Sequence, residues 1–235
     1  MERYILSKKD MYHNYFHMTH EKNLENIKMH GLLPNIGAHA KYIEKSKKVF
    51  FVEGIDNFLL LFDCWINCYF YIPVIPFIYQ LGAFFLRQKW FPMFIADGYF
   101  GTLKKSKLQR KRAFKIFDGF LNDSIVLKLD LEENVDFNYH DEDEIKARGY
   151  QKRHLELMGY SKKYSTLENN SMDKWNLHAF SNHKIDSKKI KICYLEDESY
   201  KLKDIFKYCL ENTKIDIENV CPILWDYITS RKGVF

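Results

Sequence analysis

Apolar and polar positions along this chain follow two periods, which predict a series of short strands and helices. Runs rich in apolar, β-branched and aromatic residues predict strands over 14–18, 48–53, 124–131 and 188–195. Apolar residues at every third or fourth position predict helices over 21–30, 55–71, 200–212 and 221–231. Strands and helices do not alternate as regular βαβ units, so we expect an α+β fold, with a mixed sheet and surrounding helices.

Other segments are harder to assign. The acidic patch 141–144 opens a predicted helix through Arg148, residues 149–172 predict helix and then loop, and the apolar residues 74–96 fit neither period. We expect Thr19 to be the N-cap of the helix over 21–30 and Gly31 to end that helix. His20 is expected to face solvent.

Length and composition indicate one intracellular domain. The 235 residues suit a single domain over 1–235, with a possible hydrophobic helical insertion over 56–100. Ten glycines and five prolines are too few for an all-β sandwich. The five cysteines form no C-x-x-C pair, and the N-terminus has no apolar signal core, so we expect reduced thiols and a cytoplasmic location.

One hydrophobic stretch leaves two interpretations open. No charged side chain occurs between Asp63 and Arg87, and the run 64–86 is about long enough to span a bilayer. Pro73 and Pro76 would interrupt a membrane helix, so two buried core helices that meet at a proline corner are the favoured alternative. We therefore favour a core segment and do not expect the membrane as a partner.

Several enzyme classes lack their motifs here. The chain contains neither of the Gly-rich phosphate loops G-x-G-x-x-G and G-x-x-x-x-G-K-[ST], and neither G-x-S-x-G nor H-E-x-x-H. His13, His17 and His20 are close in sequence, but strand alternation and the following turn separate them. We therefore expect no metal site.

The most informative stretch is 15–53, which reads YFHMTHEKNLENIKMHGLLPNIGAHAKYIEKSKKVFFVE. It contains, in order, a strand that ends in H-x-T, a helix, G-L, a loop and a second strand with F-F. This order resembles the opening of ADP-ribosyltransferase-like proteins, including DNA-modifying toxins and RNA 2′-phosphotransferases. The resemblance covers about the first quarter of the chain and implies an ADP-ribosyltransferase-like fold that uses NAD as a substrate.

The resemblance also implies roles for individual residues. His17 would contact the NAD ribose, donating a hydrogen bond while a neighbour fixes its other nitrogen. Thr19 would shape the pocket as well as cap the helix, and Asn35 would lie in the nucleotide site. Glu53 would either point into the cleft or simply end its strand.

Two departures from the family pattern affect the catalytic prediction. Val52 occupies the position where the family often has Ser or Tyr. The family's late glutamate, which supports an oxocarbenium-like transition state by its charge, has no Q-x-E or E-x-E signature here. Glu168 is the candidate, and Glu156 and Glu196 remain alternatives.

A second cluster lies at 171–178 and reads SMDKWNLH. The chain around it faintly resembles uncharacterised proteins of low-GC Gram-positive bacteria. Trp175, Asn176 and His178 could stack on a nucleotide base and hydrogen-bond its edge. A core tryptophan that closes a loop is the alternative.

The segment 104–115 is strongly basic, within a chain whose net charge is +5. Its candidate nucleic-acid ligands are Lys104, Lys105, Lys107, Arg110, Lys111 and Arg112. The same run could flank a membrane segment, or be a solvated helix face.

The resemblance implies an ADP-ribosyltransferase-like protein that binds NAD and transfers ADP-ribose to a protein or nucleic acid. A non-catalytic module on the same fold, which binds nucleic acid or another partner, is the first alternative. A membrane-associated protein anchored through 64–86 is the second.

Overall fold

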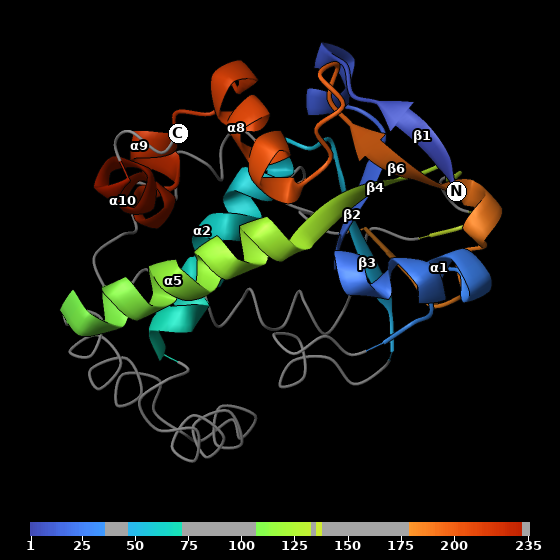
Figure 1. The fold of residues 1–235 in the computed structure, drawn as a ribbon, viewed down its shortest axis with the longest axis horizontal. Coiled ribbons are helices and arrows are strands. Elements are labelled where there is room, and N and C mark those ends of the chain that lie inside the picture. The colour runs from blue at the N-terminus through green and yellow to red at the C-terminus, as the bar shows by residue number, and fades with distance from the viewer. Residues whose placement is uncertain (36–46, 72–106, 133–134, 138–178, 232–235) are drawn as a thin grey trace.

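The computed structural model describes residues 1–35, 47–71, 107–132, 135–137 and 179–231. Its centre is one mixed sheet of six strands in the order β1-β6-β4-β2-β3-β5 (Figure 1). The strands are β1 (Glu2–Ile5), β2 (Tyr15–His20), β3 (Val49–Glu53), β4 (Ser124–Leu129), β5 (Ala179–Ser181) and β6 (Ile190–Tyr194). The first strand, β1, pairs in parallel with β6, and the other neighbours pair in antiparallel fashion. The predicted α+β class with a mixed sheet is therefore confirmed.

The sheet separates two hydrophobic clusters, because alternate residues of a strand point to opposite faces. On β2, Phe16 belongs to one cluster, whereas its neighbour Tyr15 packs against the other. Strand β4 is buried on both faces and divides its side chains in the same way: Val126 joins the first cluster and Leu127 the second. The second strand of the chain is thus held in the middle of the sheet between β4 and β3.

A helical layer covers the face of the first cluster. It consists of α2 (Asn57–Tyr71), α5 (Lys107–Asp123), α8 (Leu202–Asn212), α9 (Ile217–Val220) and α10 (Pro222–Ser230). Its core is aromatic: the Phe117 ring lies 5.1 Å from Phe62, 6.1 Å from Phe206 and 4.9 Å from Tyr227. Edge-to-face contacts of this kind join α2, α5, α8 and α10 into one layer.

One helix of this layer is capped from outside its own segment. Cys221, the residue that precedes α10, makes no side-chain cap hydrogen bond, and Pro222 follows it. The carboxylate of Asp63 in α2 instead accepts hydrogen bonds from the backbone N–H groups of Ile223 and Leu224, each at 2.8 Å. A side chain of α2 thereby satisfies amides that the start of a helix leaves without intrahelical partners.

The other face of the sheet carries the single-turn helix η2 (Glu21–Asn23), α1 (Leu24–His30) and the single-turn helix η4 (Ser187–Lys189). Gly31 ends α1, as predicted, with φ of +73°. A Cβ at this position would lie 2.2 Å from the carbonyl oxygen of Ile185. The backbone of the 180s segment can therefore approach the helix end only because residue 31 is glycine.

Several predicted boundaries need correction. The strand predicted at 14–18 is the second strand, not the first, and it continues through His20. The helix predicted over 21–30 is a single turn of 3₁₀ helix followed by α1. The predicted strands at 48–53, 124–131 and 188–195 are each present but shorter. Strands β1 and β5 were not predicted.

Among the described residues, none of the helices has the length and apolar character needed to cross a membrane. Of the hydrophobic run 64–86, residues 64–71 belong to α2 and the rest lie outside the described residues, as do 74–96 and 141–172. Three cysteines among the described residues, Cys193, Cys209 and Cys221, are buried.

Candidate functional site

The strands β2 and β3 pair over only two positions, Tyr15 with Glu53 and Phe16 with Val52. Beyond that point β3 pairs with β5 on its other side, from Val49 to Phe51. The remainder of β2 keeps its pairing with β4 through His20. The backbone pairing between β2 and β3 therefore stops just before His17, the predicted nucleotide ligand.

His17 lies at this divergence and bridges it with its side chain. Its Nδ1 is 2.7 Å from the backbone carbonyl oxygen of Phe50 in β3. A carbonyl oxygen only accepts, so Nδ1 carries the hydrogen, and Nε2 of the neutral ring is left as an acceptor. The structure thus assigns the neutral ring an acceptor at Nε2, whereas the sequence analysis expected a donor.

Burial favours this neutral form of His17. The ring is partly buried, and burial lowers its pKa from the ordinary value of 6.5, although the hydrogen bond to Phe50 acts in the opposite direction. Desolvation disfavours the imidazolium because its charge loses contact with water. Near neutral pH, His17 is therefore a fixed, uncharged hydrogen-bonding group.

Thr19 is not a helix N-cap, so that prediction was wrong. It lies within β2 opposite Ile125, and His20 is the residue that precedes η2. The Thr19 hydroxyl accepts a hydrogen bond of 3.1 Å from the side-chain amide of Asn23. Thr19 therefore holds the first turn after β2, two residues from His17 and on the same face of the strand.

His20 also differs from expectation, because it is partly buried rather than turned to solvent. Its ring makes an edge-to-face contact with Phe120 of α5, with 5.8 Å between ring centroids. Strand alternation places it on the opposite face of β2 from His17. The two histidines therefore belong to different environments, as predicted from their spacing.

Asn35 and Glu53, the other predicted nucleotide ligands on this side of the chain, lie at opposite ends of β3. Asn35 is exposed and pairs through its backbone with Lys48, just before β3. Glu53 is exposed and is the last residue of β3, and its carbonyl oxygen accepts a hydrogen bond of 2.5 Å from the Asn57 side chain. The prediction that Glu53 ends its strand is confirmed.

A polar cluster that the sequence analysis missed lies just beyond Thr19. The Glu21 carboxylate accepts a hydrogen bond of 2.7 Å from the Tyr200 hydroxyl and another from the Lys201 ammonium. The hydrogen bonds from Lys201 and from Tyr200 lower the pKa of the Glu21 carboxyl. The same two hydrogen bonds raise the pKa of their donors, Lys201 and Tyr200. The cluster joins the end of β2 to the segment before α8, across nearly the whole sequence.

The basic residues of the predicted nucleic-acid site divide between described and undescribed positions. Lys107 is the first residue of α5, and Arg110, Lys111 and Arg112 are exposed on that helix. Arg110 forms an ion pair of 3.2 Å with Asp226 of α10. Lys104 and Lys105 lie outside the described residues.

The remaining predicted site residues come from the segment 168–178, with two further glutamates as alternatives. Glu168, Trp175, Asn176 and His178 lie outside the described residues, as does Glu156. Glu196, the third candidate glutamate, is exposed two residues after the end of β6. Within the described ranges, no group of three or more His, Cys, Asp or Glu side chains could hold a metal ion.

One cavity of about 220 Å³ lies near the turns that flank β5 and η4. Its lining includes Ser181, His183 and Lys184, together with Lys189, whose ammonium is fixed by Asp136 at 2.7 Å. None of the predicted site residues lines it. The Lys189–Asp136 pair ties the 135–137 segment to the start of β6.

Comparison with known proteins does not extend this picture. No protein-family model, curated protein or solved structure matches this chain.

Proposed function

We propose that this chain binds NAD along β2 and β3, on the side of the sheet that carries α1, and uses it as a donor of ADP-ribose. The observation that carries the proposal is the bridge from His17 to Phe50 at the point where the two strands stop pairing. The order of motifs in residues 15–53, which resembles the opening of ADP-ribosyltransferase-like proteins, is the second support. The acceptor would be a protein or a nucleic acid.

The bridge supports this role because it fixes both the position and the tautomer of His17. Nδ1 is used by Phe50, and Nε2 then accepts a hydrogen bond from a donor such as a ribose hydroxyl. Thr19 is held against Asn23 on the same face. The histidine is thus oriented before any ligand arrives, which lowers the entropy lost on binding.

The transfer step would need a carboxylate as well. The bond between ribose C1′ and the nicotinamide nitrogen breaks, and its electron pair neutralises the pyridinium. A lone pair of the acceptor forms the new bond to C1′, and the acceptor loses its proton to a base. Glu168 is the proposed residue for stabilising the positive charge on the ribose.

A thermal-shift titration with NAD, ADP-ribose and nicotinamide tests binding. Saturating NAD should raise the melting temperature, because a ligand that binds only the native state stabilises it. If neither NAD nor ADP-ribose changes the melting temperature, the proposal is overturned.

Two substitutions at position 17 separate ligand binding from strand bridging. His17→Asn can place its amide N–H near the Phe50 carbonyl but lacks a group equivalent to Nε2. It should therefore fold and lose the NAD-dependent shift. His20→Ala is the control, since it removes a neighbouring histidine from the opposite face, and it should keep the shift.

Release of nicotinamide from NAD distinguishes an enzyme from a binding module. Release that depends on both His17 and Glu168 supports the transferase. An NAD-dependent thermal shift without nicotinamide release, across candidate protein and nucleic-acid acceptors, would show a binding module instead.

A further inference from the structure

Helix α5 carries its charges in the order that opposes its own dipole. Its first eleven residues, 107–117, include five cations and no acid: Lys107, Arg110, Lys111, Arg112 and Lys115. Its acidic residues, Asp118 and Asp123, lie in the C-terminal part. A helix is stabilised by anions near its N-terminus and cations near its C-terminus. Helix stability therefore does not explain this distribution.

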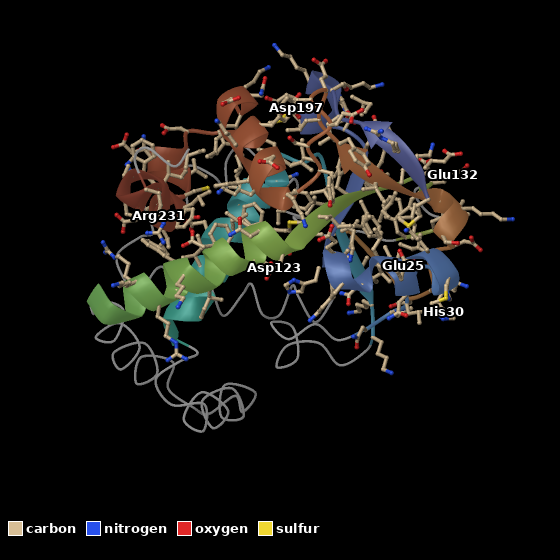
Figure 2. The ribbon with its side chains drawn as sticks, viewed as in Figure 1. Glu25, His30, Asp123, Glu132, Asp197 and Arg231 are labelled. Atoms are coloured by element: carbon tan, nitrogen blue, oxygen red, sulfur yellow. The ribbon has the colours of Figure 1, made fainter. Side chains whose placement is uncertain are left out.

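The helix is firmly attached to the fold along its apolar side. Ala113, Phe114, Phe117 and Leu121 are buried in the helical layer. At the other charged positions, Asp118 accepts hydrogen bonds from the Tyr227 hydroxyl at 2.6 Å and from Arg231 at 2.5 Å. Asp123, labelled in Figure 2, lies at the end of α5 that leads directly into β4. The opposite, basic half extends away from the sheet (Figure 1).

Three cations are exposed on the solvent side of this half: Lys111, Arg112 and Lys115. Positions 111 and 115 are four residues apart and 112 and 115 are three apart, so they share one face of the helix. Within the part of the chain that the structure describes, these three side chains form no ion pair. Their charge is therefore available to a partner.

Gly119 continues the same face one turn after Lys115. Among the described residues, a Cβ at position 119 would meet no atom outside its own stretch of helix within 4 Å, so packing in this part of the chain does not require a glycine there. Glycine inside a helix is unfavourable relative to alanine. A glycine in this position leaves the helix backbone open to close approach from outside.

We propose that Lys111, Arg112, Lys115 and Gly119, together called the α5 basic face, bind the phosphate backbone of a nucleic acid. The three cations would contact phosphates, and Gly119 would let the strand lie close against the helix. Charge complementarity identifies the partner as a polyanion. This inference stands apart from the proposed NAD site, because it uses none of the same residues.

The burial of the apolar side of α5 favours nucleic acid over an anionic membrane. A helix that lies on a membrane inserts its apolar face among the lipid chains. In α5 that face is occupied by the helical layer, which includes Phe114 and Phe117. Binding to anionic vesicles would contradict this reasoning, so the test includes them.

Fluorescence anisotropy with labelled single-stranded DNA, single-stranded RNA and duplex DNA, over a series of salt concentrations, tests the proposal. The variant carries Lys111→Gln, Arg112→Gln and Lys115→Gln. If each side chain contacts one phosphate, binding of a single strand at 0.1 M salt should weaken by about 100-fold. The slope of log affinity against log salt should become shallower by about 2 to 3.

A second triple variant controls for net charge. Lys8→Gln, Lys9→Gln and Lys207→Gln change the same number of charges at exposed positions on other elements. This control should bind nearly as well as the unmodified chain. Equal weakening in both variants, or absence of binding by the unmodified chain, would overturn the proposal.

Gly119→Ala separates backbone approach from charge. This variant should melt at a higher temperature and yet bind nucleic acid more weakly, because its methyl group obstructs the close contact. Unchanged binding would remove Gly119 from the face. Binding to phosphatidylserine vesicles, with none to the three nucleic acids, would assign the surface to membranes and contradict the inference.

Discussion

The imidazole of His17 and the backbone carbonyl of Phe50 are joined by a hydrogen bond of 2.7 Å where β2 and β3 no longer pair. A side chain thus replaces the backbone hydrogen bond that a continuous sheet would have at this point. The consequence is a strand pair that depends on the protonation and chemistry of one residue.

The free energy of unfolding should decrease as the pH falls, in part because of His17. Burial lowers its folded-state pKa below 6.5, so below that pH the unfolded chain takes up a proton that the folded chain resists. The contribution is present above pH 6.5 and is lost as pH falls through the folded pKa. Urea denaturation between about pH 5 and 7 should show a steeper loss for the unmodified chain than for His17→Asn. Equal slopes would contradict the assigned burial.

Gly119→Ala should stabilise the protein. The position is helical, its φ is not positive, and a Cβ there would meet nothing within 4 Å among the residues that the structure describes outside the helix's own backbone. Alanine restricts the unfolded chain more than glycine does, so the free energy of unfolding should rise by about 0.5–1 kcal/mol. Chemical denaturation measures this change. A decrease would show that the helix surface at 119 is already covered.

The same substitution at Gly54 should have the opposite effect. Gly54 has φ of +70°, and a Cβ would lie 2.5 Å from the carbonyl oxygen of Met11. The left-handed backbone alone costs an L-residue about 1–2 kcal/mol, and the contact adds to this cost. Gly54→Ala should therefore lower the denaturation midpoint by more than Gly119→Ala raises it. An unaltered midpoint would show that β3 can leave Met11 at no cost.

Asp63→Ala should destabilise the contact between α2 and α10. The substitution leaves the amides of Ile223 and Leu224 without their acceptor, in a buried position. Loss of partners for buried donors costs about 1–3 kcal/mol. Asp63→Asn is the matched control, because it keeps an oxygen acceptor and should cost less. The two variants can be ranked by denaturation in urea, and equal losses would assign the effect to charge alone.

The sequence predicts best those elements whose two faces are both buried. Strands β4 and β6 were recognised from apolar runs, although the predicted ends extend too far. Strand β4 stops at Leu129 because its partner β6 begins opposite, at Ile190. Such an end is set by pairing between distant segments, and the local pattern does not contain it.

Strand β1 was missed because it lies at the edge of the sheet. Of its four residues, Glu2, Arg3 and Ile5 are exposed, so no run of buried side chains marks it. Strand β5 has only three residues. Thr19 was assigned to a cap because Thr favours that position, but pairing of Thr19 with Ile125 and His20 with Ser124 extends the strand instead.

The candidate site was only partly accessible to the same reasoning. Residue type and motif order identified His17, but its partner is a backbone carbonyl, which no sequence pattern distinguishes. The cluster of Glu21, Tyr200 and Lys201 joins residues 179 and 180 positions apart. Proximity of that kind follows from the order of strands, which local periodicity does not determine.

The parallel pairing of β1 with β6 has a consequence for how the protein is made. Tyr4 pairs with Cys193 and Ile5 with Tyr194, so β1 is synthesised long before β6, its only described strand neighbour. The sheet therefore cannot be completed until the long segment between these two strands has been made. Until then, an unpaired strand edge is open to chaperones and to other nascent chains.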